Sequence, residues 1–247
     1  MKSPVDAGFD RWKVFQLLRF NNYLGHRETY RGLRHFLKSH FPEPFKVLDL
    51  GCGNALPIAV ALRGLPITRY IGVDTSSEML AQAGKNLAKL KRRIALHESD
   101  ALRFVQGRRE KVDVVWMGLL FHHFPRLLKL ELLHHVRRLL KQNGCLLAHD
   151  PLVREVESRK DYLRRMAGTC DREWLVISPA DKFVLYRHWG RHGMQERFST
   201  MTSLARKAGF STPEILWRDK HDLFALMVFS ASGGQPGLRP RTNPDRV

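Results

Sequence analysis

The chain alternates two kinds of hydrophobic pattern between residues 46 and 150. Short β-branched runs are followed by longer amphipathic stretches, and this order repeats along the segment. Such alternation is typical of a parallel sheet whose strands are connected by helices. We expect strands near 46–51, 69–74, 93–98, 112–118 and 144–150. We expect helices between them near 54–64, 77–91 and 126–142.

Regular patterns also flank this central unit. Residues 8–40 have a helical pattern, and residues 153–200 form a polar, aromatic-containing segment with short helices. A further helix near 200–209 precedes two strands near 213–218 and 222–230. We expect these last strands to be antiparallel, because their connection is too short for a crossover helix.

Residues with strong positional preferences mark several ends of these elements. Ser76 or Ser77 is a suitable N-cap for the second helix, and Asn143-Gly144 is expected to end the third in a left-handed conformation. Gly209 is expected to close the helix near 200–209. Asp219-Lys220-His221 is expected to form the turn between the last two strands.

A glycine-rich turn follows the first strand in the sequence VLDLGCGNA, from Val47 to Ala55. A glycine-rich turn that leads from a strand into a helix lets the backbone approach a ligand closely. A nicotinamide dinucleotide is not favoured, because Leu56 stands where the third glycine of GxGxxG belongs and Asp49 would repel a pyrophosphate. The turn also lacks the Lys-Ser/Thr pair of a phosphate-binding P-loop. A cofactor with a cationic sulfonium and an amino group suits Asp49 better.

Together with this turn, three later motifs resemble those of the class I S-adenosylmethionine-dependent methyltransferases. They are IGVDTS at 71–76, ESDA at 98–101 and VDVVWM at 112–117 followed by GLLFHHF at 118–124. The resemblance runs from about Phe45 to Leu152 and more weakly to Ser230. One departure is Ala55, which replaces the last glycine of the family's first motif. The resemblance to the small-molecule, type 11/12-like branch rests on His122-His123-Phe124-Pro125.

The resemblance implies a fold, a cofactor and a set of binding residues. The fold is α/β, a Rossmann-like doubly wound sheet of seven strands, mostly parallel with an antiparallel last hairpin, plus a helical cap. The cofactor is S-adenosyl-L-methionine, with Asp74 accepting hydrogen bonds from the ribose hydroxyls and Asp100 and Ala101 meeting the adenine. The cofactor-binding residues are expected to be Asp49, Gly51, Cys52, Gly53, Asp74, Thr75, Met79, Asp100, Ala101 and Met117.

The same reasoning divides the chain into segments. Residues 1–44 are expected to form an N-terminal helical cap segment. Residues 45–231 form the methyltransferase domain, with a cap or lid insertion at about 153–200. The glycine- and proline-containing residues 232–247 read as a flexible tail.

Candidate catalytic residues follow the fourth and fifth strands. His122, His123 and Asp150 fall at the edge of the sheet where ligands bind in open α/β folds. A hydroxyl acceptor would need a base, whereas an amine or thiolate would need little help. Two other interpretations stay open for the histidines: His122 or His123 shapes the cofactor pocket, and His149 is a core residue.

The formal net charge of +18 raises the question of an anionic partner. The basic residues around 89–93, 108–111 and 137–141 precede strands, so they lie opposite the candidate site and are poor evidence for a nucleic-acid substrate. Arginines between 154 and 197 follow the fifth strand. They either bind an anionic acceptor or keep a lid solvated.

These observations favour methyl transfer to a small-molecule acceptor. The alternatives are an RNA methyltransferase and a catalytically idle S-adenosylmethionine-binding protein. No apolar run is long enough to span a bilayer and no signal peptide is apparent, so we expect a cytoplasmic protein. The three cysteines have no CxxC spacing, and no metal site is expected. The acceptor's identity and the oligomeric state do not follow from the sequence.

Overall fold

The computed structural model describes residues 11–90 and 92–231. The tail expected at 232–247 lies outside the described residues, and the division of the chain into segments stays a prediction.

A single sheet forms the centre of the described structure. Its strand order is β3-β2-β1-β4-β5-β8-β7, and the two-residue β6 pairs with the end of β5. The first five of these are parallel, and β8 runs antiparallel to both β5 and β7. The predicted doubly wound sheet with an antiparallel last hairpin is therefore confirmed. The bounds are β1 (Phe45–Leu50), β2 (Ile67–Asp74), β3 (Arg93–Glu98), β4 (Val112–Gly118), β5 (Leu140–Val153), β6 (Glu196–Arg197), β7 (Glu214–Arg218) and β8 (Phe224–Ser230).

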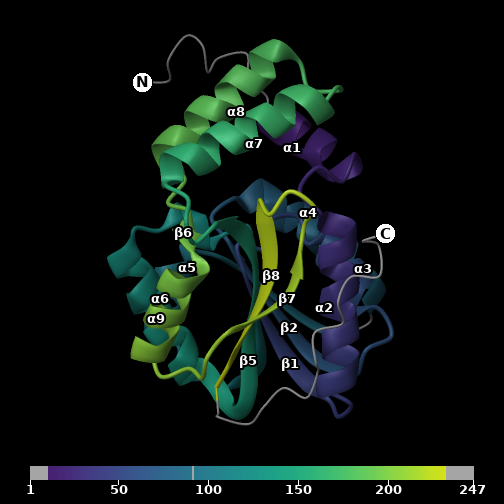
Figure 1. Ribbon diagram of the computed structural model, residues 1–247. Coiled ribbons are helices and arrows are strands. Elements are labelled where there is room, and N and C mark those ends of the chain that lie inside the picture. The colour runs from purple at the N-terminus through teal and green to yellow at the C-terminus, as the bar shows by residue number, and fades with distance from the viewer. Residues whose placement is uncertain (1–10, 91, 232–247) are drawn as a thin grey trace.

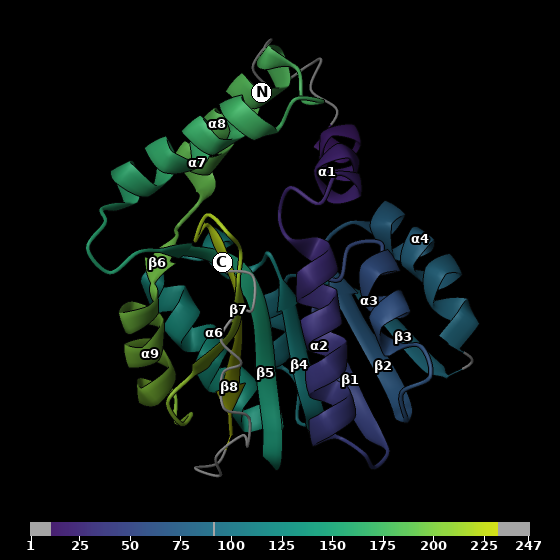
Figure 2. The ribbon, with the colours of Figure 1, turned by 45° about the vertical axis from the view of Figure 1, so that its right-hand side comes forward.

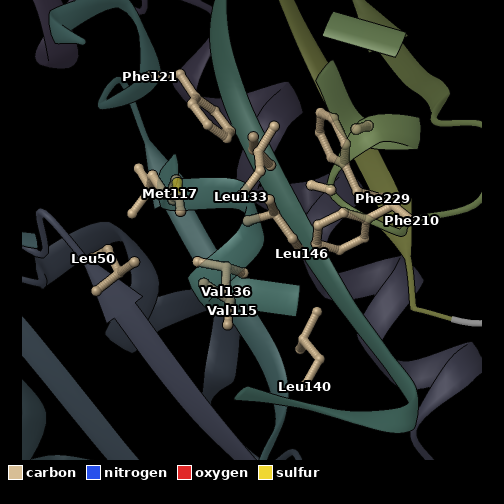
Figure 3. Packing of buried hydrophobic residues seen from close by; sticks show 14 of the residues in the cluster. Leu50, Val115, Met117, Phe121, Leu133, Val136, Leu140, Leu146, Phe210 and Phe229 are labelled. Carbon is tan, nitrogen blue, oxygen red and sulfur yellow. The ribbon is translucent and has the colours of Figure 1, made fainter. Parts of the chain in front are cut away.

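Helices cover both faces of this sheet (Figure 1). One face carries α2 (His26–His40), α3 (Leu56–Leu62) and α4 (Ser77–Leu87), which is followed by the 3-10 helix Ala88–Leu90. The other carries α5 (Ala101–Gln106), α6 (Arg126–Leu139) and α9 (Phe198–Lys207). Both faces bury apolar side chains, as a parallel sheet requires. In Figure 3, Leu50 of β1 and Val115 of β4 lie in the core with Val136 of α6.

Three more helices lie beyond the C-terminal ends of the parallel strands. They are α1 (Arg11–Phe20), α7 (Arg159–Glu173) and α8 (Pro179–His192), and we call them the helical cap. Figures 1 and 2 both show the cap at one end of the sheet. Val14, Tyr162 and Leu185, one from each helix, belong to an apolar cluster that also includes Phe224 of β8. This packing places the cap directly over the edge where the candidate site residues emerge.

Several helix bounds differ from the predictions. Residues 8–40 contain two helices separated by a turn at 21–25, in which Asn22 and Gly25 have left-handed backbones. The cap helices α7 and α8 have 15 and 14 residues and are not the short helices expected. The short α5 was not predicted.

The predicted helix end at Asn143-Gly144 is wrong. Helix α6 ends at Leu139, and β5 begins at Leu140. Gly144 does not have a positive φ; a Cβ there would lie 2.8 Å from the carbonyl oxygen of Asp113. The glycine therefore serves the close approach of neighbouring strands.

Other predicted ends are confirmed. Ser76 caps α4 by accepting a hydrogen bond from the Met79 N–H at 3.2 Å. Gly209 follows α9 with φ 87°. Asp219 holds the turn before β8 by accepting hydrogen bonds from the N–H groups of Leu223 and Phe224, both at 2.6 Å.

Within residues 11–90 and 92–231, no helix is both long enough and apolar enough to cross a bilayer.

Candidate active site

The glycine-rich turn uses its backbone amides to hold its own shape. Gly51 and Gly53 have φ values of 70° and 51°, a region that suits glycine. The N–H groups of Gly51 and Cys52 donate to the carbonyl of Val73 at 2.8 and 3.0 Å. Because these amides already have partners, they do not form the free set of donors that cradles a phosphate. The geometry thus agrees with the exclusion of pyrophosphate and P-loop ligands.

Asp74 is fixed at the end of β2 by two backbone donors. Its Oδ2 accepts from the Gly53 N–H at 2.8 Å, and its Oδ1 accepts from the Ser76 N–H at 2.9 Å. An ionised carboxylate offers about four lone-pair sites, so each oxygen can still accept another hydrogen bond. The half-buried carboxylate is therefore held in a fixed orientation with acceptor sites left for a ligand.

Asp49 is a buried carboxyl with one unpartnered oxygen. It is 1% exposed, and its Oδ2 accepts from the Tyr70 hydroxyl at 2.6 Å. Its Oδ1 has no hydrogen-bond partner among the described residues. The pKa of Asp49 is raised to about 7. Burial is the main cause and the charge of Asp74 adds to it, whereas the hydrogen bond from Tyr70 acts in the opposite direction. A cationic group bound beside the turn would compensate this carboxylate, so the site fits a positively charged cofactor.

The other predicted cofactor residues differ in accessibility. Thr75 is exposed, Met79 is half-buried in the first turn of α4, and Cys52 is 9% exposed. Asp100 is exposed and caps α5 by accepting from the Arg103 N–H at 3.0 Å, and the buried Ala101 follows it. The side chain of Met117 is 1% exposed and lies in the core (Figure 3), so a ligand could meet only its backbone. These assignments stay predictions.

His122 and Asp150 form a hydrogen-bonded pair at the same edge. The chain leaves β4 through Leu119, whose φ is 57° and whose N–H donates to the carbonyl of His149 at 2.7 Å. The 3-10 helix Phe121–His123 follows and brings His122 Nδ1 to 2.9 Å from Asp150 Oδ1. The histidine and aspartate side chains are 12% and 6% exposed. With Nδ1 donating to the carboxylate, Nε2 is the basic nitrogen of the ring.

His123 and His149 are neutral at physiological pH. Burial and the charges of His122, His188 and His192 lower the pKa of His123 to about 3. Burial, together with the charges of His26 and His122, lowers the pKa of His149 well below its usual value. His149 is 1% exposed, and its Nε2 has no partner among the described residues. Its burial favours the interpretation as a core residue.

A cavity of about 190 Å³ lies between the helical cap and the sheet edge. Beside it, the Met194 N–H donates to the carbonyl of His122 at 2.6 Å, and buried Lys129 donates to the carbonyl of Met194. These two hydrogen bonds hold Met194 in place, and the next residue, Gln195, lines the cavity. The lining residues are Val14, Phe15, Leu18, Leu24, Leu119, His122, His123, Pro151, Met166, Leu185, His188, Trp189, Gln195 and Phe224.

The histidines around the cavity do not form a metal centre. His123 lies 6.2 Å from His188, and His188 lies 5.2 Å from His192, measured between ring centroids. Within the described residues, no three His, Cys, Asp or Glu side chains are arranged to hold a metal ion.

Three of the arginines that follow β5 bind the protein's own groups. Arg165 pairs with Glu157 at 2.6 Å, and Arg154 pairs with Asp222 at 3.2 Å. Arg159 donates to backbone carbonyls at the end of α8, including Gly190 at 2.9 Å. None of the three lines the cavity.

Sequence reasoning missed much of the cavity wall. The helical pattern over 8–40 was recognised, but its apolar positions were not assigned to the site, and Gln195 belongs to no motif. The extra signal available was the apolar stripe of α1, which is more than a solvated helix needs.

Comparison with known proteins identifies the central segment. Residues 47–144 match the methyltransferase domain family. A ribosomal protein L11 methyltransferase of Thermotoga neapolitana is 27% identical over 143 residues, which cover 58% of this chain and 52% of the relative. A trans-aconitate 2-methyltransferase of Enterobacter sp. (strain 638) is 33% identical over 134 residues, covering 48% of each chain. The chain thus spans about half the length of these curated relatives.

Solved structures share the fold over most of the chain. The plantazolicin methyltransferase BpumL, solved in complex with SAH, superposes with a TM-score of 0.64 at 13% identity and covers 92% of both chains. The mitomycin 7-O-methyltransferase MmcR superposes with a TM-score of 0.54 at 16% identity, covering 75% of this chain and 49% of its own. At these identities the likeness shows the fold.

Proposed function

We propose that this chain, whose central domain is of the class I S-adenosylmethionine-dependent methyltransferase type, transfers a methyl group to a small-molecule acceptor. The observation that carries the proposal is the position of the His122–Asp150 pair. It lies at the same edge of the sheet as the glycine-rich turn, and its histidine lines the cavity under the cap. Ligands of open α/β sheets bind at this edge.

Residues of the first and second strands would hold the cofactor. Asp74 would accept hydrogen bonds from the ribose, Asp49 would face the positive charge, and Gly51 and Gly53 leave room for close approach. Asp100 and Ala101 would meet the adenine. When bound, S-adenosylmethionine supplies a methyl group activated by a sulfonium.

His122 is proposed as the general base and Asp150 as the residue that orients it. The aspartate fixes the ring so that Nε2 accepts the acceptor's proton, and its charge stabilises the imidazolium that forms. His123, being neutral and buried, would shape the pocket. The cap would exclude water and hold the acceptor near the reacting centre.

Cofactor binding is tested with Asp74→Ala. We expect this variant to lose detectable binding of S-adenosylmethionine in calorimetry, because both ribose hydrogen bonds disappear along with the anchor of Gly53. Glu43→Ala, which removes an exposed acid far from the turn, is the matched control and should bind normally. Unchanged affinity in Asp74→Ala would remove the site assignment.

The base is tested with His122→Gln and Asp150→Asn. Loss of a positioned base is expected to lower kcat by about 10²- to 10⁴-fold in His122→Gln, and Asp150→Asn should lower it less. Cofactor affinity should stay unchanged, which separates the catalytic effect from misfolding. A His122→Gln variant with near-normal turnover would leave methyl transfer standing without this base.

The two alternatives differ in the fraction that receives the methyl group. A labelled-methyl assay on separated RNA, protein and metabolite fractions should label metabolites. A groove on the opposite side from the cavity is lined by five basic residues, Arg108, Arg109, Lys111, Arg137 and Arg138. RNA bound there through its phosphates would not place a nucleobase beside His122. An idle cofactor-binding protein would label no fraction. The cytoplasmic location stays a prediction.

A further inference from the structure

Most of the side chains that line the cavity are apolar. The cap contributes Val14 and Leu18 from α1, Met166 from α7 and Leu185 from α8, and β8 contributes Phe224. The described lining residues include no lysine, arginine, aspartate or glutamate. A carboxylate or phosphate moved into this space would lose its hydration without gaining a lysine or arginine partner.

Two of the polar groups in the wall, His123 and Gln195, offer no charge to a ligand. His123 is neutral because burial holds its pKa at about 3. Gln195 accepts a hydrogen bond from Arg159 at 3.1 Å, and that guanidinium is turned toward the carbonyls of Trp189 and Gly193. This cation beside the wall is therefore held by backbone oxygens and is not offered to a ligand.

The space inside the cavity fits about one ring. Apolar cavities of about 150 Å³ bind benzene. The cavity here measures about 190 Å³, which leaves room for a ring and a small substituent. Trp189 and Phe224 lie in its wall, and aromatic side chains favour stacked or edge-on contacts with a ring.

The His122–Asp150 pair indicates that the acceptor has a group that must lose a proton during the reaction. A neutral amine would not need the base, whereas a hydroxyl would. A phenolic hydroxyl, with a pKa of about 10, gives up its proton to imidazole far more readily than an aliphatic alcohol does.

We propose that the acceptor is an uncharged, single-ring phenol whose oxygen is methylated beside His122. This inference rests on the proposed function and specifies its substrate class. The phenol's O–H bond breaks and its proton goes to Nε2 of His122. The oxygen gains the methyl group, and the electron pair of the broken carbon–sulfur bond stays on the sulfur of the product S-adenosylhomocysteine.

The first test compares acceptors on the full chain. Phenol, 2-methoxyphenol, benzyl alcohol, benzoate and trans-aconitate are offered with labelled S-adenosylmethionine. We expect kcat/KM for the two phenols to exceed that for either carboxylate by at least about 100-fold. Faster methylation of benzoate or trans-aconitate than of the phenols would overturn the inference.

A binding measurement separates this inference from the proposed function. Phenol and benzoate are titrated by calorimetry into the protein saturated with S-adenosylhomocysteine. Phenol binding without benzoate binding supports the inference whether or not turnover is seen. No phenol binding, together with labelling of another metabolite in a cell extract, would overturn the inference and leave the proposed function intact. No labelling of any fraction would count against the proposed function.

A positive charge placed in the cavity wall should weaken phenol binding and allow benzoate to bind. Phe15 lines the cavity and is 39% exposed, so Phe15→Arg adds a cation at its mouth without filling the core. We expect about tenfold weaker phenol binding and new benzoate binding. Val156→Arg adds the same charge at a side chain that is 98% exposed and outside the cavity, and it should change neither affinity. Equal effects of both substitutions would contradict the assignment of the wall.

Discussion

Ala55 shows what a single methyl group costs and contributes in the glycine-rich turn. Its φ of 52° is left-handed, and such a backbone costs an L-residue about 1–2 kcal/mol. Its methyl group is 1% exposed, and burying one such group returns about 0.8 kcal/mol. The two effects nearly offset each other, which explains how alanine occupies a position where the resembled family has glycine.

Substitution of Ala55 should therefore depend on branching at Cβ. We expect Ala55→Gly to change the free energy of unfolding by less than about 1 kcal/mol. Ala55→Val should destabilise the protein by more than about 2 kcal/mol, because a β-branched residue tolerates positive φ poorly. Urea unfolding of the two variants measures both values. Similar losses in both would show that burial at this position outweighs backbone strain.

Asp49 should make stability depend on pH. Its pKa is raised in the folded state to about 7 from 3.8, so the folded state holds a proton that the unfolded chain has lost. Its contribution is fully present below pH 3.8 and is lost as the pH rises through 7. Asp49→Asn should therefore be more stable than the parent at pH 8, by up to about 4 kcal/mol, and by about half as much at pH 5.5. Urea unfolding at both pH values checks this, and an equal difference at both would contradict it.

The sequence allowed the surroundings of some residues to be predicted, but not those of others. The resemblance indicated Asp74 and the turn because these lie in one short stretch each. His122 and Asp150 were selected separately, and their pairing depends on how β4 and β5 align. Asp49 was assigned to a cationic ligand from its charge, but its unpartnered oxygen became visible only once Tyr70 was placed on the neighbouring strand.

At the scale of elements, Arg159 connects the start of α7 to the end of α8. Its guanidinium donates to the carbonyls of Trp189, Gly190 and Gly193, where α8 ends and carbonyls lack helical partners. It also donates to the side chain of Gln195 in the cavity wall. One planar cation thus holds two cap helices and a wall residue together.

Removal of Arg159 should affect the acceptor more than the cofactor. We expect Arg159→Ala to raise the acceptor KM by about tenfold, equivalent to about 1.4 kcal/mol, with little change in cofactor affinity. Arg159→Lys should restore only part of this, because an ammonium cannot reproduce the planar fork. Steady-state kinetics with calorimetry of cofactor binding tests this; a parallel loss of cofactor binding would point to a general loss of structure.

Element boundaries were predictable where sequence and local geometry agreed. Ser76 and Gly209 mark helix ends through local hydrogen bonds and backbone conformation, so they were recognised. The end of α6 was misplaced because Asn143-Gly144 has the composition of a helix stop, although the contact between Gly144 and β4 is a tertiary requirement. Helix α5 has six residues and was too short for a periodic pattern.

Over the whole molecule, buried neutral histidines should make the fold sensitive to acid. Burial lowers the pKa of His26 to about 4 and that of His123 to about 3, and the pKa of His149 lies well below its usual value. Below about pH 6.5 the histidines of the unfolded chain bind protons, whereas those of the folded chain stay neutral. The free energy of unfolding therefore decreases as the pH falls below 6.5. Asp49 acts in the opposite direction, but it is one group against three.

The free energy of unfolding should therefore fall steeply between pH 6.5 and pH 4. Each histidine adds up to about 1.4 kcal/mol per pH unit to the slope. Urea unfolding at half-unit pH steps measures the slope, and His149→Met should reduce the net slope by about half, because Asp49 already offsets one of the three histidines. A slope that is flat across this range would contradict the burial of neutral histidines.

The walls of the cavity come from both sides of the segment that matches the family. Leu119, His122 and His123 lie within residues 47–144, whereas Val14 precedes the segment and Leu185 follows it. If the chain transfers a methyl group as proposed, a mutation that reshapes the cap changes the space for the acceptor without altering Asp49 or Asp74, the residues proposed to hold the donor. The preference for an acceptor could then change while the donor stays the same.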